Sequence, residues 1–226
     1  MLNDNILDNI LDTVAMGNAE MTFKSYHVAR TNEAFSFLGI RSPGLEASLS
    51  DCYNRIETEF AGKTLPDECL RIIFSVTTPL QYQVEVRKLE SLNKKIVLSV
   101  VRLNERPPPS SAFKWTNRKV WDDLFRQKAP QADDILTIGP SGELIETSRF
   151  NIFCFDPASH RVFTPGLDSG CLNGVFRRAS LNAESFSVPL LGFLKVSEKK
   201  ISLREVAAST LFVGNSVRGL LPAVLL

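Results

Sequence analysis

Histidine is scarce in this 226-residue sequence, which has two, and its four cysteines show no C-x-x-C spacing. The clusters of thiols and imidazoles that hold structural zinc are therefore missing, and we expect no metal site. No apolar run approaches the roughly 20 residues that a membrane-spanning helix requires. The formal net charge is only +1, so we expect neither a membrane nor a nucleic acid as a partner.

The first residues, MLNDNILDNILD, are acidic and lack the basic and apolar regions of a secretory signal. With cysteines that we expect to be reduced, this favours a cytoplasmic protein. Hydrophobic residues make up 44% of the chain and charged residues 23%, which is typical of a globular protein. The length suffices for one large domain or two small ones.

Hydrophobic periodicity predicts an α+β protein with two subdomains. Helices are expected at 25–39, 45–62, 117–128 and 174–181, and strands at 70–76, 81–88, 95–103, 134–138, 149–155, 161–165 and 209–216. Three successive prolines follow the third strand, and proline fits neither a helix interior nor a central strand. We therefore expect a small N-terminal α/β subdomain at 1–104, a proline-rich linker at 105–113 and a C-terminal subdomain at 114–226.

Lys114 lies between two aromatic residues, Phe113 and Trp115. Taken alone, it reads as a solvated lysine at the start of a helix. The alternative is a Schiff-base lysine, because an amine that loses hydration has a lower pKa and a more available lone pair.

Glu146 interrupts an apolar stretch at 142–153. It is either an exposed carboxylate at an edge or a buried one that needs a cationic or hydrogen-bonding partner. Asn151 follows just before IFCF, where it could pair with the backbone at a strand start or orient a ligand.

Two glycine-containing loops could bind an anion. Residues 164–178 run from a loop into a helix, whose first backbone N–H groups form a natural phosphate cradle. The arginine pair 177–178 is expected on the surface of that helix. In 212–222 a strand ends at a turn that offers Ser216, with Arg218 beside it for a substrate carboxylate. Either loop could also be an ordinary turn.

Six stretches in order resemble the class IV (fold-type IV) pyridoxal-phosphate enzymes, which include branched-chain and D-amino-acid aminotransferases and aminodeoxychorismate lyase. They are ILDTVAM, HVAR, KWTNR, ETSRFNIF, TPGLDSGCLNGVFR and NSVRGLLP. The resemblance covers nearly the whole chain. It implies the D-amino-acid aminotransferase-like fold, with the cofactor pyridoxal 5′-phosphate between the small and the large subdomain, and a homodimer.

The resemblance also implies roles for individual residues. Lys114 would bind the cofactor covalently and then move protons. Glu146 would pair with the pyridine nitrogen, and Arg30 would bind the phosphate. Further cofactor contacts would come from Asn151, Val175, Phe176 and Ser216.

The C-terminal NSVRGLLP looks closer to aminodeoxychorismate lyases, which convert 4-amino-4-deoxychorismate to 4-aminobenzoate and pyruvate for folate biosynthesis. For such a small-molecule substrate, the resemblance suggests Thr13 for positioning a proton and Asn215 and Arg218 for binding carboxylates. Ala15 stands where the family commonly has an arginine. A class IV aminotransferase acting on a branched-chain or D-amino acid and a non-catalytic binding module remain as alternatives.

Overall fold

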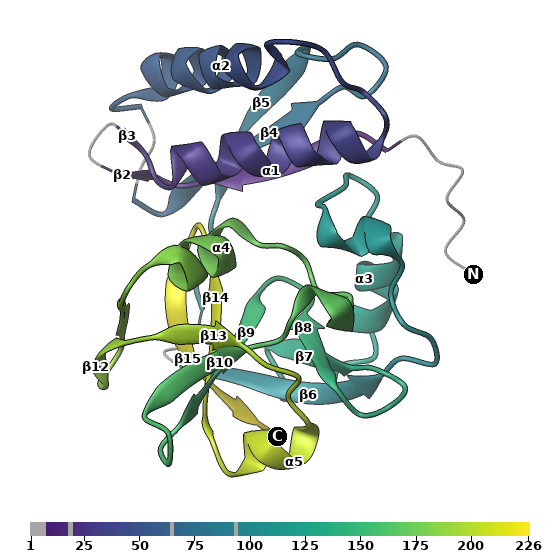
Figure 1. Cartoon of the computed structure of the whole chain (residues 1–226), viewed down its shortest axis with the longest axis vertical. Coiled ribbons are helices and arrows are strands. Elements are labelled where there is room, and N and C mark those ends of the chain that lie inside the picture. Colours follow the sequence, from purple (N-terminus) through teal and green to yellow (C-terminus); the bar gives the residue numbers. More distant parts are fainter. Residues whose placement is uncertain (1–7, 18–19, 64–65, 93–94) are drawn as a thin grey trace. The chain divides into compact units, whose positions relative to one another are not determined.

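The computed structural model describes residues 8–17, 20–63, 66–92 and 95–226. The chain divides into two compact units (Figure 1). Unit 1 comprises Met1–Ser91 and Phe113–Asn117, and unit 2 comprises Leu92–Ala112 and Arg118–Leu226. None of the described helices combines the length and hydrophobicity that crossing a membrane would require.

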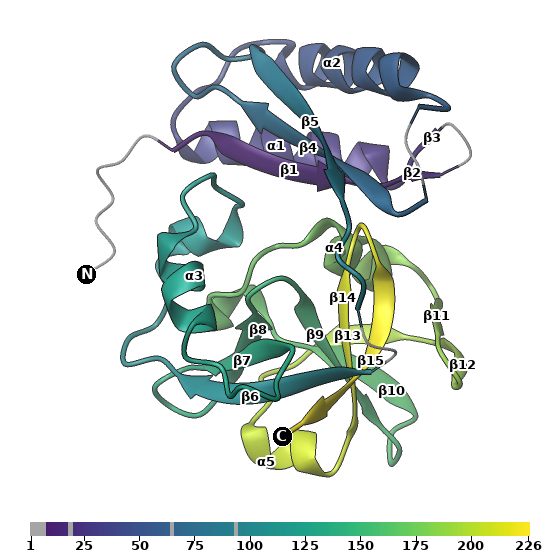
Figure 2. The ribbon, with the colours of Figure 1, turned by 180° about the vertical axis from the view of Figure 1, so that it is seen from behind.

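Unit 1 is a three-stranded antiparallel sheet covered by two helices. The strands, in the order β1-β4-β5, are β1 (Ile10–Val14), β4 (Glu68–Phe74) and β5 (Tyr82–Lys88). Helices α1 (Lys24–Phe37) and α2 (Leu45–Phe60) lie on the same face of this sheet (Figures 1 and 2). A small hairpin of β2 (Met16–Gly17) and β3 (Glu20–Met21) connects β1 to α1.

The core of unit 1 follows from the two periodicities of its elements. Alternate residues of β1 point to one face of the sheet, and Ile10 and Val14 join the apolar core there. From α2, Leu49 and Tyr53 meet them one turn apart. Asp12 lies between Ile10 and Val14 on the same face and is fully buried. A carboxylate thus enters an otherwise apolar layer.

The segment Phe113–Asn117 pairs with β1 through its main chain. Leu11 N donates to Lys114 O at 2.8 Å, and Thr116 N donates to the carbonyl of Asn9 at 2.9 Å. These bonds place Lys114 in unit 1, whereas the sequence suggested it as the start of the C-terminal subdomain. Pairing between segments about 100 residues apart leaves no local pattern that a reader of the sequence could detect.

Unit 2 is built on an eight-stranded mixed sheet with the order β13-β10-β9-β14-β15-β6-β7-β8. The strands are β6 (Ile96–Arg102), β7 (Asp134–Ile138), β8 (Leu144–Thr147), β9 (Asn151–Asp156), β10 (Arg161–Thr164), β13 (Val196–Glu198), β14 (Thr210–Asn215) and β15 (Gly219–Leu225). The helices are α3 (Lys119–Phe125), α4 (Val175–Asn182) and α5 (Leu203–Ala207). Short 3-10 turns occur at Pro109–Ala112 and Leu167–Ser169.

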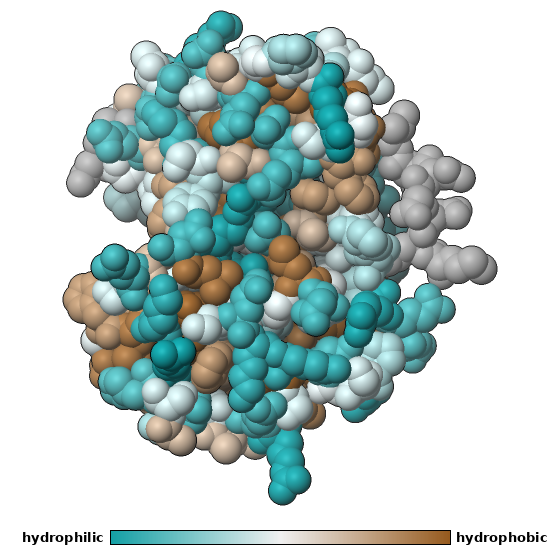
Figure 3. Space-filling model, in the orientation of Figure 1, coloured by the Kyte–Doolittle hydropathy of each residue, from teal (hydrophilic) through white to brown (hydrophobic). Residues whose placement is uncertain are grey.

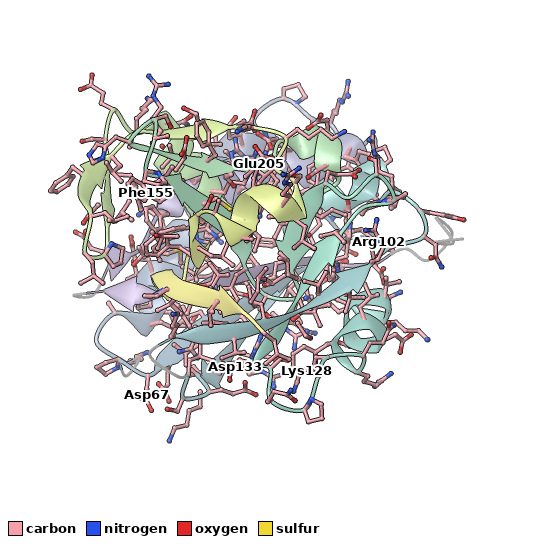
Figure 4. All side chains as sticks on the ribbon, turned by 90° about the horizontal axis from the view of Figure 1, so that it is seen from below. Asp67, Arg102, Lys128, Asp133, Phe155 and Glu205 are labelled. Atoms are coloured by element: carbon pink, nitrogen blue, oxygen red, sulfur yellow. The ribbon has the colours of Figure 1, made fainter. Side chains whose placement is uncertain are left out.

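Strand β6 belongs to unit 2, although the sequence placed residues 95–103 in the N-terminal subdomain. It pairs in parallel with both β7 and β15. Side chains strengthen this placement: Val97 N donates to Asp133 Oδ2 at 2.9 Å, and Arg102 donates to the carbonyl of Gly139 at 3.3 Å. Figure 4 labels Asp133 and Arg102 along this part of the sheet.

A hairpin of β11 (Phe186–Val188) and β12 (Gly192–Leu194) extends from unit 2. Leu190 at its tip is 98% exposed and Phe193 is 75% exposed. Figure 3 shows apolar surface over this hairpin. The core of unit 2 accordingly leaves these two side chains without cover.

Candidate functional site

Lys114 and Thr13 are two of the candidate site residues, and both lie in unit 1. Lys114 Nζ donates to Thr13 Oγ1 at 2.7 Å, and both residues are half-buried. The contact follows from the backbone pairing of the Lys114 segment with β1. By strand alternation, Thr13 points to the sheet face opposite that of Asp12. The lysine is therefore held against the sheet by a specific hydroxyl.

Asp12 is the centre of a buried hydrogen-bond network on the helix-covered face. Its carboxylate accepts from His27 Nδ1 at 2.8 Å and from the Tyr53 hydroxyl at 2.5 Å. It also accepts from the Arg30 guanidinium and from Thr13 N, the latter at 2.8 Å. Burial alone would raise the pKa of Asp12, but the charge of Arg30 and the hydrogen bonds from His27 and Tyr53 hold that pKa well below its usual range.

The partners of Asp12 are themselves buried. His27 is fully buried, which lowers its pKa against the opposing pull of Asp12, and its Nε2 has no hydrogen-bond partner among the described residues. A neutral imidazole that donates from Nδ1 fits this arrangement. Burial and the neighbouring Asp12 raise the pKa of Tyr53 well above its ordinary value, so its hydroxyl is a donor at any ordinary pH.

Glu146 lies in unit 2, on β8, and is 5% exposed. Its backbone is fixed by Thr137, whose hydroxyl donates to Glu146 O at 2.7 Å. Burial raises the pKa of Glu146 to about 8, although the Leu172 N–H and the charges of Arg118 and Arg177 pull in the other direction. The carboxyl group is thus poised to gain a cationic partner.

Asn151 and Gly174 shape the start of helix α4. Asn151 Nδ2 donates to the Leu172 carbonyl at 2.9 Å. A side chain at Gly174 would place its Cβ 2.0 Å from Asn151 Oδ1, so any other residue here would displace the Asn151 side chain. Gly174 is also the N-cap of α4, without a side-chain cap. The first backbone groups of the helix, at Val175 and Phe176, are of the kind that bind anions.

Arg177 contradicts the sequence interpretation, which expected it on the helix surface. It is 1% exposed. Its guanidinium donates to the carbonyl of Pro165, at 2.8 Å from Nη2, and to Glu198 on β13. A planar fork with five donors can satisfy a loop carbonyl and a carboxylate at once, and this explains why an arginine is tolerated inside the unit.

The β14–β15 turn carries the other predicted residues. Asn215 Oδ1 accepts from Val217 N at 3.1 Å and from Arg218 N at 2.9 Å. Asn215 therefore shapes the turn that presents Ser216 and Arg218, both of which are half-buried. The strand before the turn approaches the start of α4, since a Cβ at Gly214 would lie 2.7 Å from the Phe176 ring.

Within each unit, the structure brings predicted residues together. In unit 1 Lys114 contacts Thr13, whose N–H binds the same carboxylate as Arg30. In unit 2 Glu146, Asn151, Val175 and Phe176 gather at the start of α4 and the loop before it. Asp12 and Tyr53 were missed. The signal for Asp12 was an acidic residue at an inward position of a strand, whereas Tyr53 simply continued an apolar helical pattern.

In the part of the chain that the structure describes, no group of histidine, cysteine and acidic side chains could hold a metal ion. The four cysteines are free thiols and are buried.

Comparisons with known proteins agree with this architecture. The model of the family described as amino-transferase class IV matches residues 9–226. Curated proteins gave no match. Among solved structures, a hypothetical aminotransferase from Mycobacterium tuberculosis in its pyridoxal-phosphate-bound form aligns with a TM-score of 0.79 at 15% identity, covering 96% of this chain and 81% of that chain.

Two further solved structures represent the two enzyme types. A protein from Legionella pneumophila, provisionally described as a 4-amino-4-deoxychorismate lyase, aligns with a TM-score of 0.77 at 19% identity, covering 100% of this chain and 87% of that one. A protein from Mesorhizobium loti, provisionally described as an amino-acid aminotransferase, aligns with a TM-score of 0.74 at 23% identity, covering 96% and 99%. The predicted α+β fold is confirmed. At these identities the likeness concerns the fold alone.

Proposed function

The chain belongs to the class IV aminotransferase family, and from that premise we propose that it is a lyase that converts 4-amino-4-deoxychorismate to 4-aminobenzoate and pyruvate. The family depends on pyridoxal 5′-phosphate, which is therefore the cofactor of this protein. When bound, the cofactor supplies an aldehyde that joins an amine covalently and a ring that accepts electrons.

The residues of this chain fit that cofactor. Glu146 is a buried carboxyl with a raised pKa, and a protonated ring nitrogen would be the cation that it needs. Gly174 keeps the start of α4 open, and a helix N-terminus suits a phosphate. We propose that Lys114 binds the aldehyde, that Arg30 with the backbone of Val175 and Phe176 binds the phosphate, and that Ser216 and Asn151 complete the site.

The contact between Lys114 Nζ and Thr13 Oγ1 carries the catalytic proposal. Lys114 would remove the proton from the amine-bearing carbon of the substrate, after which the C–O bond to the enolpyruvyl group breaks. The departing enolpyruvate takes up one proton and becomes pyruvate, while the ring becomes aromatic. A hydroxyl 2.7 Å from the lysine is within the range of proton transfer, so Thr13 would position that proton.

Substrate binding is proposed for the turn between β14 and β15. Arg218 would bind a carboxylate of the substrate, because a guanidinium pairs with a carboxylate in a bidentate way. Asn215 would assist, and its contacts with the backbone of the turn support at least a role in presenting Arg218.

The test supplies the purified protein with 4-amino-4-deoxychorismate, and separately with branched-chain or D-amino acids plus 2-oxoglutarate. Pyruvate and 4-aminobenzoate support the lyase. Glutamate formation without 4-aminobenzoate would replace it with the second candidate, an aminotransferase, which is the activity that the description of the matching family model names.

The cofactor link has its own control. Lys114→Ala should abolish the absorbance band of the bound cofactor, whereas Lys119→Ala should retain it, since Lys119 pairs with Asp123 on the surface of α3. Protein that stays colourless after addition of the cofactor would indicate a non-catalytic binding module. We also propose a homodimer in the cytoplasm, and a measured mass of twice 25.2 kDa would support the dimer.

A further inference from the structure

The buried network around Asp12 does more than fill the core. We propose that Tyr53 and Asp12 are positioning residues, which hold the Arg30 guanidinium in the orientation that binds the cofactor phosphate. The inference rests on the proposed function, because it assigns to Arg30 the phosphate of pyridoxal phosphate.

Three different elements meet at Asp12. The carboxylate comes from β1, Arg30 comes from α1, and the Tyr53 hydroxyl comes from α2. Its two oxygens are both engaged: Oδ1 accepts from Arg30 and Thr13 N, and Oδ2 accepts from Tyr53. A carboxylate bound on both oxygens cannot rotate without breaking bonds, so the direction in which it faces Arg30 is fixed.

The Arg30 side chain binds an anion better when its conformation is already restricted by Asp12. Its side chain is long and rotamer-rich, so ordering it costs conformational entropy. The side chain is 7% exposed, so most of this cost is already met by the fold. A guanidinium has five N–H donors, and one carboxylate cannot occupy them all. Asp12 can therefore orient the guanidinium from the core side while other donors serve an anion.

Tyr53 is the residue that stabilises Asp12 in this role. It is fully buried, and its hydroxyl is shared between Asp12 and Thr31 Oγ1, at 2.5 and 2.8 Å. Packing alone does not require this hydroxyl, because a phenylalanine would fill the same volume. Buried polar networks often cost stability relative to apolar side chains, and a positioning role accounts for this one.

The experiment measures the dissociation constants of two ligands, pyridoxal phosphate and pyridoxal, which differ only in the phosphate. The readout is the dissociation constant of pyridoxal divided by that of pyridoxal phosphate, both taken from the absorbance change on binding. In wild-type protein this ratio should be high, which means a strong preference for pyridoxal phosphate. Tyr53→Phe should weaken pyridoxal phosphate binding about tenfold, the loss expected for a hydrogen bond to a charged group, and leave pyridoxal binding unchanged.

A matched control is Tyr82→Phe, the same change at a β5 tyrosine that packs against Phe74 in the same unit. It should leave the ratio as in wild type. Arg30→Gln should abolish most of the preference for the phosphate. In the double variant Arg30→Gln/Tyr53→Phe, the second substitution should have no further effect, because a positioning residue acts only through the group that it positions.

The outcomes separate the two claims. If wild-type protein binds pyridoxal phosphate no better than pyridoxal, the proposed function and this inference both fall. If wild-type protein prefers the phosphate but Tyr53→Phe keeps the full preference, or weakens both ligands equally, only the inference falls. Should Tyr53→Phe fail to fold, Thr31→Val, which removes the other partner of the Tyr53 hydroxyl, should lower the ratio, and an unchanged ratio would overturn the inference.

Discussion

Glu146 carries a pKa of about 8 because it is buried, while an unfolded chain would give it an ordinary value near 4.5. Between these values the unfolded state releases a proton that the folded state keeps, so the cofactor-free protein should lose stability as the pH rises from about 4.5 to 8. Glu146→Gln should remove this loss of stability. Chemical denaturation at pH 5 and pH 8 measures the free energy of unfolding, which at pH 8 should be higher in the variant than in wild type by on the order of a few kcal/mol.

An equal difference between variant and wild type at both pH values would contradict this prediction. With bound cofactor the wild-type protein should be more stable than Glu146→Gln. The protonated ring nitrogen that we propose as the partner of Glu146 stabilises an ionised carboxylate, which glutamine cannot provide.

Arg177 supports a second prediction at this scale. Arg177→Met should destabilise the protein by about 2 kcal/mol, because it removes both guanidinium hydrogen bonds to the carbonyl of Pro165 and the partner of Glu198. The loss is smaller than for a fully buried pair, since the Glu198 side chain is 49% exposed. Thermal denaturation measures the loss, with Arg204→Met on the exposed side of α5 as the control. Equal melting temperatures for the two variants would refute it.

Individual residues differ in how well the sequence predicts their surroundings. The aromatic neighbours of Lys114 and the apolar surroundings of Glu146 are visible in the sequence, and the structure finds both side chains at least half-buried. The Tyr53–Asp12 bond joins residues 41 positions apart. An amphipathic pattern predicts that Tyr53 faces inward but carries no information about the partner of its hydroxyl.

At the scale of elements, the short helix α5 offers a clear test. Ser202 caps it by accepting from Glu205 N, and the Glu205 side chain accepts from Ser202 N at 2.8 Å. Figure 4 labels Glu205 on this helix. Ser202→Ala should lower the free energy of unfolding by about 1 kcal/mol, as measured by urea denaturation. A loss in the free energy of unfolding below a few tenths of a kcal/mol would mean that packing alone stabilises the helix.

Long elements with a clear period were predicted correctly, among them α1, α2, β4 and β5. Among the elements of three to five residues, β7 and β10 were predicted, but β11, β12, β13 and α5 were not, because so short a stretch shows no reliable period. Strand β15 was missed for another reason. It contains Pro222, which argues against a strand paired on both sides, and its pairing with β6 begins only at Ala223.

At the scale of the whole molecule, cofactor binding should stabilise the fold. A ligand at 100 times its dissociation constant adds about 2.7 kcal/mol to the free energy of unfolding. We therefore expect pyridoxal phosphate to raise the melting temperature of the wild-type protein and to raise that of Lys114→Ala much less. Calorimetry with and without the cofactor measures both shifts. Equal shifts in melting temperature would show that cofactor binding does not depend on Lys114.

The architecture and the family were predicted from six ordered stretches, and the family match confirms them. The assignment of segments to units could not be predicted equally well. The parallel pairing of β6 and the attachment of Phe113–Asn117 to β1 are contacts between distant parts of the chain. Prolines mark a change of direction in the chain but do not tell which unit the following residues join.

The return of Phe113–Asn117 to unit 1 has a consequence for protein synthesis. A nascent chain that ends near residue 91 contains α1, α2 and all three strands of the first sheet, yet the outer edge of β1 still awaits its last main-chain partner. That edge stays open until residues 113–117 have been translated and have emerged from the ribosome. An engineered fragment that stops before residue 113 would carry the same open edge, and it would lack Lys114, the residue that we propose binds the cofactor.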